Sequence, residues 1–486
     1  MFDSAITMMR YATSILRGRL RPGVLTRIAD DLVATLAEFG APGDDSALLP
    51  GQDSALDADV RRMITTRSLR RTAQAAAQNT AYYRRLFRAA GIQPRHLSVD
   101  DWGSVPLTSK KALRSMPSAF VSARANPVLL ASTTGTTGTP TSVWFSAAEI
   151  EILVALNMIG LSIAEGMRSH HVLAQATSSR STLVQVLVPE AARRTGVSLI
   201  QLGTIDPVLA LERLAAPLGL PGKAAQPTHL AVVASYLAAL IGAAEAGGWQ
   251  SGDFGLESIQ AGGEVLSDAL RSRAREVLGA EVTSNYAATE TVPAGAAACR
   301  QGHLHHPAEF GHVELLDPET FEPARPGEIA TLVVTPYVPY RDCTLVLRYV
   351  TNDLVRVLDE VPSCELSGLP ASSAILGRFS GPSSLLVPTR AILELLEGDR
   401  AIPLPARYSL ADDPAGPVLH VAAGRPSGTL MGRLEERAAD LAPKLAGIVL
   451  HEDPDALPSP VPLQCDLVEH SFELAGRVSD PIGRPA

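Results

Sequence analysis

The stretch of this 486-residue chain with the most specific chemistry is a run of hydroxyl side chains around two glycines. Residues 132–140 read Ser-Thr-Thr-Gly-Thr-Thr-Gly-Thr-Pro. Gly135 and Gly138 permit positive φ angles, so successive backbone N–H groups can turn toward one anion while the hydroxyls add neutral donors. The stretch is therefore predicted to bind phosphate. Its spacing differs from the G-x-x-x-x-G-K-S/T loop of mononucleotide-binding proteins, and a solvent-exposed Ser/Thr/Gly loop is the alternative interpretation.

Three further elements follow this loop in order and carry groups that suit nucleotide binding. They are Ala261-Gly262-Gly263-Glu264, the segment 284–290 with Tyr286, Thr289 and Glu290, and the segment 347–354 with Asp353, followed by Gly377-Arg378. Paired glycines allow the backbone to approach a planar ligand closely. Taken singly, Tyr286 would be interpreted as a half-buried core residue, Glu290 as a solvated carboxylate or helix-cap partner, and Asp353 as a turn cap.

The four elements, in this order, resemble the adenylate-forming superfamily of acyl-CoA synthetases, adenylation domains and luciferases. Residues 79–87, 90–92 and 105–110 are similar to the opening segment of phenylacetate:coenzyme A ligases. The resemblance covers roughly residues 75–380. It implies an α/β fold with a large N-terminal domain and a small C-terminal α+β domain.

The resemblance also implies roles for individual residues. ATP phosphates would bind Ser132, Thr133, Thr134, Gly135, Thr136, Thr137 and Gly138. Mg²⁺ would bind Glu290, since magnesium prefers hard oxygen donors. Tyr286 would stack on adenine, Asp353 would accept hydrogen bonds from the ribose hydroxyls, and Thr289 would contact the α-phosphate, where charge shifts in the transition state. The remaining predicted nucleotide-binding residues are Gly262, Gly263, Glu264 and Arg378.

The chain departs from this family's pattern at its lysines. Thr139 stands where the phosphate loop normally has a lysine, and no lysine follows Lys444, although the family's last motif carries a catalytic one. Arg477 is the candidate replacement, yet its forked guanidinium is not equivalent to an ammonium at a reacting centre. The hinge after Arg378 also lacks its usual aspartate. Adenylation and the rotation of the small domain are therefore both open questions at this stage.

Cysteine and histidine residues resemble a zinc cluster found in some phenylacetate ligase relatives. Cys299, His305 and Cys364 are the candidate ligands. Structural zinc takes four ligands, so the fourth would be His303 or Cys343. Reduced cysteines and surface histidines are the alternative.

Composition limits the classes of partner and the compartment. A net charge of −9 argues against a nucleic-acid surface, which needs clustered cations. Four scattered cysteines are too few for a disulfide framework, so a reducing cytoplasm is expected. No segment supplies about 20 consecutive apolar residues, so no membrane span is predicted. Residues 1–21 are predicted to form an amphipathic helix that packs on the protein.

Hydrophobic periodicity divides the chain into three parts. Residues 1–95 are predicted to be a helical leader, with helical spacing at 25–39 and 60–90. Residues 96–378 alternate strands and helices, then change at 311 to antiparallel strands near 312–316, 328–336 and 344–349. Residues 379–486 are predicted to be the small domain, with strands at 417–422 and 465–469 and a helix at 430–445.

The leading functional prediction is ATP-dependent activation of a small, aromatic carboxylic acid as acyl-AMP. The acyl group would pass to coenzyme A, a carrier-protein thiol or an amine. A family member that uses a pre-activated acyl donor or catalyses a condensation is the first alternative. A non-catalytic protein that binds nucleotide or a partner is the second. The oligomeric state stays open, with a homodimer among the options.

Overall fold

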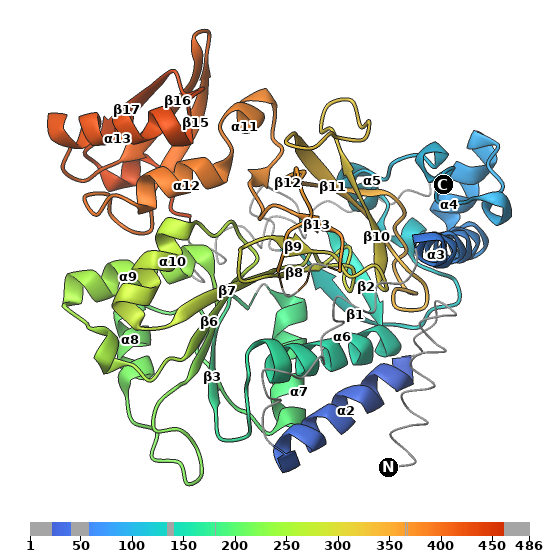
Figure 1. The fold of residues 1–486 in the computed structure, drawn as a ribbon, viewed down its shortest axis with the longest axis horizontal. Helices are drawn as coiled ribbons and strands as arrows, with labels where there is room; N and C mark the ends of the chain where they lie inside the picture. Colours follow the sequence, from blue (N-terminus) through green and yellow to red (C-terminus); the bar gives the residue numbers. More distant parts are fainter. Residues whose placement is uncertain are drawn as a thin grey trace, which may run out of the picture.

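The computed structural model describes residues 22–39, 58–133, 140–179, 181–364, 366 and 368–460 (Figure 1). The strands in these residues form four sheets. A largely parallel sheet occupies the centre of the molecule, the helical leader lies on one side of it, and the C-terminal elements lie on the other.

The described part of the leader contains three helices, as predicted: α2 (Pro22–Phe39), α3 (Ala58–Asn79) and α4 (Ala81–Ala90). The amphipathic helix predicted at 1–21 lies outside the described residues. Helix α4 begins where the Tyr83 N–H donates to Thr80 Oγ1, and it ends at Gly91, whose φ of 65° is the left-handed conformation that favours glycine. Tyr83 and Phe87 are buried in one core with Trp102. This core holds the turns η2 (Pro94–His96), η3 (Trp102–Ser104) and η4 (Pro117–Phe120) and helix α5 (Lys110–Ser115).

The largest sheet has eight strands in the order β13-β9-β8-β7-β6-β5-β3-β4. Its strands are β3 (Val172–Ala176), β4 (Ser198–Gln201), β5 (His229–Val233), β6 (Ser258–Gly262), β7 (Glu281–Tyr286), β8 (Ala296–Ala298), β9 (Leu304–His305) and β13 (Ala371–Ser372). Strands β3 to β7 are parallel, and the last three pair antiparallel. Parallel strands place their carboxyl ends at one edge, where open α/β sheets bind ligands.

Helices connect the parallel strands, which gives the alternation predicted from sequence. They are α7 (Thr182–Thr195), α8 (Pro207–Ala215), α9 (Ala234–Gly247), η6 (Ser251–Asp253) and α10 (Asp268–Leu278), and α6 (Ala147–Ile159) with the π-turn η5 (Gly160–Ala164) leads into β3. The described part of the chain has one helical stretch, 147–164, that is long and apolar enough to cross a bilayer. In this fold α6 contacts α2 and α7 and buries Ile152, Leu153 and Met158, as a core helix does.

Two smaller sheets flank the central one. Strands β1 (Pro127–Ser132) and β2 (Ser142–Ser146) form a hairpin, and β10 (Gly311–Leu316), β11 (Ile329–Pro336), β12 (Tyr349–Arg356) and β14 (Gly377–Arg378) form an antiparallel sheet. The strand predicted at 344–349 is wrong, because β12 begins only at Tyr349. Arg348 has a φ of 43°, which interrupts extended backbone, and the apolar residues before it are buried in the core instead of pairing in the sheet.

The C-terminal elements form a third small sheet with its own core. Strands β15 (Tyr408–Asp413), β16 (Gly416–Ala422) and β17 (Gly447–His451) pack with α11 (Pro382–Leu386), α12 (Thr389–Glu397), α13 (Gly428–Leu441) and η7 (Pro454–Ala456). The predicted strand at 417–422 and the helix near 430–445 are confirmed. The strand predicted at 465–469 lies outside the described residues.

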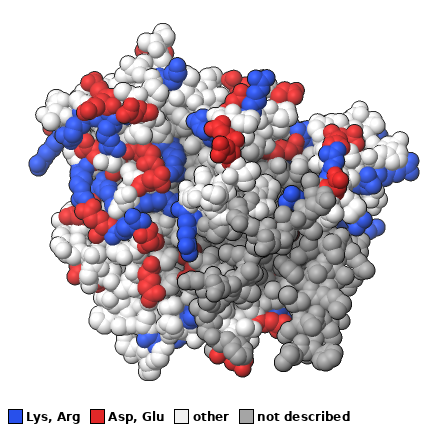
Figure 2. All heavy atoms as spheres, in the orientation of Figure 1, with Lys and Arg blue, Asp and Glu red and all other residues white. Residues whose placement is uncertain are grey.

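This C-terminal unit contacts the start of α10 through polar groups. The Glu394 carboxylate accepts the N–H groups of Asp268 and Ala269 at 2.7 and 2.9 Å, which caps the helix and complements its dipole. Arg390 pairs with Asp268 at 2.8 Å. Figure 2 shows acidic and basic side chains interleaved over α10, α12 and α13. A Cβ on Gly242 of α9 would lie 2.5 Å from the Leu404 carbonyl oxygen, so this close approach requires glycine.

The carboxyl of Glu397 makes this contact sensitive to pH. Burial raises its pKa to about 7, although the Ser267 hydroxyl donates to it. Because the unfolded chain releases this proton near pH 4.5, the folded state is progressively penalised as pH rises from there to about 7. We expect Glu397→Gln to leave stability unchanged at pH 4 and to raise the free energy of unfolding by up to about 3 kcal/mol at pH 8.

Thermal unfolding at the two pH values measures this effect. Glu436→Gln, at an exposed position of α13, is the matched control and should change neither midpoint. If Glu397→Gln raised the unfolding temperature equally at pH 4 and pH 8, the raised pKa of Glu397 would not explain the stabilisation.

Candidate functional site

The β1–β2 hairpin carries the loop predicted to bind phosphate. Ser132 ends β1, and two hydrogen bonds close the base of the loop. The Thr133 N–H donates to the Thr141 carbonyl at 3.1 Å, and the Thr141 N–H donates to Thr133 Oγ1 at 3.0 Å. The other predicted phosphate-binding residues lie outside the described residues: Thr134, Gly135, Thr136, Thr137 and Gly138. Their role stays a prediction.

Tyr286, Asp353 and Arg378 lie on three different strands and meet at one point. Tyr286 ends β7, and Arg378 is the register partner of Asp353 across β12 and β14. The Tyr286 hydroxyl donates to Asp353 Oδ2 at 2.8 Å, and Arg378 Nε donates to Asp353 Oδ1 at 2.9 Å. Burial and the Asp353 charge raise the pKa of Tyr286 well above its usual value, so the phenol stays a donor. The structure thus brings together three of the predicted nucleotide-binding residues.

Glu290 lies four residues beyond the end of β7, beside this cluster, and is buried with 3% exposure. Its Oε1 accepts the Tyr349 hydroxyl at 2.9 Å and lies 3.2 Å from Lys110 Nζ. Burial and the Glu290 charge raise the pKa of Tyr349, and the charge of Asp353 contributes in the same direction. The two carboxylates therefore belong to one electrostatic site at the carboxyl end of the parallel strands.

Lys110 is a site residue that the sequence analysis did not identify. It is one of four lysines in the chain, and it ends the segment 105–110 that is similar to phenylacetate ligases. Both signals were present, but neither indicates that Lys110 would reach Glu290, 180 positions away. Lys223, by contrast, donates to the carbonyls of Ser169 and Gly196 near the opposite edge of the sheet.

The backbone around Lys110 is held against β12. The Thr108 N–H donates to the Arg348 carbonyl at 2.9 Å, and the Val350 N–H donates to the Thr108 carbonyl at 3.0 Å. The Thr108 hydroxyl donates to the Leu347 carbonyl at 2.6 Å. Ser109 then caps α5 by accepting the Ala112 N–H, so the helix starts with Lys110 directed at the site.

The predicted glycines lie where β6 ends. Gly263 has a φ of 79°, and a Cβ on Gly262 would meet nothing within 4 Å, so there is open space beside this backbone. The Glu264 carboxylate accepts the Ser235 N–H at the start of α9 at 2.7 Å, which gives it a role in holding the loop. Thr289 is half-buried next to Glu290. Arg477, the proposed replacement for the catalytic lysine, lies outside the described residues.

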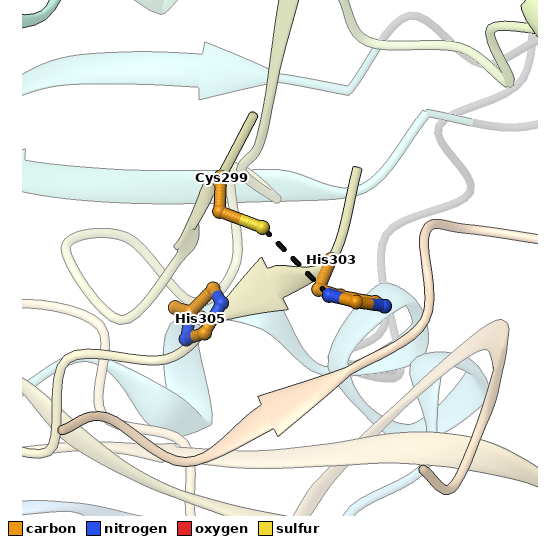
Figure 3. Close-up of side chains that lie close together, drawn as sticks. All are labelled: Cys299, His303 and His305. Carbon is orange, nitrogen blue, oxygen red and sulfur yellow. Dashed lines mark hydrogen bonds between the residues drawn. The ribbon is translucent and has the colours of Figure 1, made fainter. Parts of the chain in front are cut away.

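A second cluster combines thiol and imidazole groups (Figure 3). The ligand atoms of Cys299, His303 and His305 all lie within 4.8 Å of one another. Cys299 Sγ is 3.8 Å from His303 Nδ1, and Cys364 Sγ is 3.2 Å from His305 Nε2. The turn between β8 and β9, with Gly302 at a φ of 83°, brings the first two residues together.

The group of three, together with Cys364 beside His305, supplies the donor types of a structural zinc site. Two thiols and two imidazoles are a common tetrahedral combination. Of the two alternatives for the fourth ligand, the geometry favours His303. Cys343 is held elsewhere, since its N–H donates to Glu149 Oε1 at 3.1 Å. We therefore propose Cys299, His303, His305 and Cys364 as zinc ligands.

No protein-family model matches the chain, and no curated protein sequence matches it. Solved structures do match. The chain is similar to 2-hydroxyisobutyryl-CoA ligase in the postadenylation state in complex with R3-HIB-AMP. The TM-score is 0.66 at 18% sequence identity, over 85% of this chain and 90% of that chain. For an open conformation of the same ligase in complex with 2-HIB-AMP and CoA, the TM-score is 0.57 at 17% identity, over 88% and 95%.

The chain therefore has the fold of the adenylate-forming CoA ligases, as the order of its motifs predicted. The same ligase in the postadenylation state with 2-HIB-AMP also gives a TM-score of 0.66, at 18% identity over 87% of this chain and 92% of that chain.

The zinc proposal has a direct elemental test. We expect the purified protein to contain one zinc per chain by inductively coupled plasma mass spectrometry. Removing one thiolate ligand in Cys364→Ser should strongly reduce zinc content and lower the unfolding temperature. Cys343→Ser is the matched control and should retain zinc. Equal zinc content in all three proteins would exclude this site.

Proposed function

We propose that the protein activates a small carboxylic acid with ATP to form an acyl-AMP. The acyl group would then pass to coenzyme A, a carrier-protein thiol or an amine. The observation that carries this proposal is the buried Glu290, paired with Lys110 beside the Tyr286–Asp353–Arg378 cluster. The fold supports it, since the matching ligase structures contain acyl-AMP and, in the open state, CoA.

The chemistry follows from these groups. A carboxylate oxygen of the acid attacks the α-phosphorus of ATP, and the bond to the β-phosphate bridging oxygen breaks. Asp353 would accept hydrogen bonds from the ribose hydroxyls and fix the nucleotide, and Tyr286 would stack on adenine. Mg²⁺, when bound at Glu290, would neutralise phosphate charge. The hydroxyl-rich loop from Ser132 to Gly138 would hold the leaving pyrophosphate.

The finer parts of the proposal rest on the sequence. The similarity of residues 79–110 to phenylacetate ligases favours an aromatic acid. We also propose the division into a leader (1–95), a core (96–378) and a small domain (379–486), and a location in the cytoplasm. The missing lysine after Lys444 favours one alternative, in which the protein takes a pre-activated acyl donor and does not adenylate.

Glu290→Gln tests adenylation directly. The variant keeps the size of the side chain and removes the charge that would hold Mg²⁺, so we expect pyrophosphate release to fall by roughly a hundredfold or more. The assay is hydroxylamine-trapped pyrophosphate release with Mg²⁺-ATP over a panel of aromatic and short aliphatic acids.

Glu257→Gln is the control, because this glutamate is exposed and precedes β6, at the opposite end of that strand from Gly262. Undiminished release in Glu290→Gln would remove the assignment. If the wild type released no pyrophosphate but converted synthetic acyl-AMP, the alternative with a pre-activated acyl donor would be favoured.

A further inference from the structure

Lys110 contributes a partly buried positive charge whose position packing alone does not explain. Its side chain is 15% exposed and that of Glu290 is 4% exposed, so both charges have been taken largely out of water. Desolvating two charges is costly, and apolar residues of similar volume are often as stable. A buried ion pair at the edge of a sheet where ligands bind therefore suggests a functional reason for the lysine.

The surroundings keep this ammonium in place. Thr108 is bonded on both sides to β12, and its Oγ1 lies 2.7 Å from the Tyr83 hydroxyl of α4. The Tyr83 hydroxyl in turn accepts the Leu347 N–H at 2.7 Å. Lys110 is thus two residues from a point tied to both the leader and β12, and its reach to Glu290 is defined by rigid elements.

The described cluster has no excess positive charge to balance anionic substrates. Glu290 and Asp353 are balanced by Lys110 and Arg378, so the cluster is close to neutral by itself. ATP and a carboxylate substrate bring several negative charges that repel one another as they approach. If Glu290 held Mg²⁺, the Lys110 ammonium would be released from its 3.2 Å pairing with that carboxylate and would be available to the substrate anions. A lysine is a compact point charge with three rotatable donors, which suits two acceptors at once.

We propose that Lys110 is the catalytic cation of the adenylation step, in place of the lysine absent from the C-terminal region. This inference rests on the proposed function. The ammonium contacts the substrate carboxylate and the α-phosphate together while the new C–O–P linkage forms and pyrophosphate leaves. The step needs no acid or base from Lys110.

The experiment compares two half-reactions in Lys110→Gln. Adenylation is measured as pyrophosphate release with Mg²⁺-ATP and the best acid. The second step is measured as thioester formation from synthetic acyl-AMP and coenzyme A. We expect a hundred- to a thousandfold loss in adenylation and less than a tenfold loss in thioester formation. Lys111→Gln, an exposed neighbour on α5, is the matched control and should keep both rates.

Lys110→Arg covers the case in which Lys110→Gln does not fold. Arginine preserves the charge beside Glu290 but replaces the ammonium with a fork, so a catalytic role predicts at least a tenfold loss in adenylation at an unchanged unfolding temperature. A purely structural partner of Glu290 predicts wild-type adenylation in Lys110→Arg, or equal losses in both half-reactions of a destabilised Lys110→Gln. Either result overturns the proposal.

The test separates this inference from the proposed function. If the wild type and Lys110→Gln adenylate at the same rate, only the role of Lys110 is overturned and the proposed function stands. A wild type that releases no pyrophosphate with any acid, yet converts acyl-AMP, overturns the proposed adenylation and this role with it.

Discussion

The candidate site depends on how the negative charge of the buried Glu290 carboxylate is balanced. A carboxylate with 3% exposure needs partners, because an unpaired buried charge costs several kcal/mol. Its partners come from two distant segments, Tyr349 at the start of β12 and Lys110 at the start of α5. One buried charge therefore unites the loop after β7, the antiparallel sheet and the segment that follows the leader.

The helical leader consequently supports the site and is not an appendage. Tyr83 of α4 lies in the same core as Trp102 and reaches the Thr108 hydroxyl and the Leu347 backbone. Thr108 in turn determines where α5 begins. Packing in the leader is thus connected, through hydrogen bonds of 2.7 Å, to the position of the ammonium at Lys110.

The sequence predicted the fold well where pattern and local chemistry agree. Periodicity predicted the parallel strands and their connecting helices. The family resemblance implied that Tyr286, Asp353 and Arg378 serve one ligand, and the structure places these three side chains together. The sequence did not predict the late start of β12, because the apolar run 345–347 resembles a strand although Arg348 has a positive φ. It also did not predict the Lys110–Glu290 pair or the choice of His303 over Cys343, since both depend on contacts between distant segments.

The polar contact between α10 and the C-terminal unit bears on how such a site would work. Glu394, Arg390 and Glu397 contact α10 through hydrogen bonds and ion pairs, and Leu404 adds an apolar contact with the core around α9. Such a largely polar contact is typical of interfaces that can form and separate. In a protein whose catalytic lysine lies on the small domain, adenylation waits for that domain to deliver it. Lys110 starts α5 and is not part of the C-terminal unit, so in our proposal the catalytic cation does not have to be delivered by that unit. Adenylation would then depend on the leader, and the small domain would be left to govern access to the acyl-AMP.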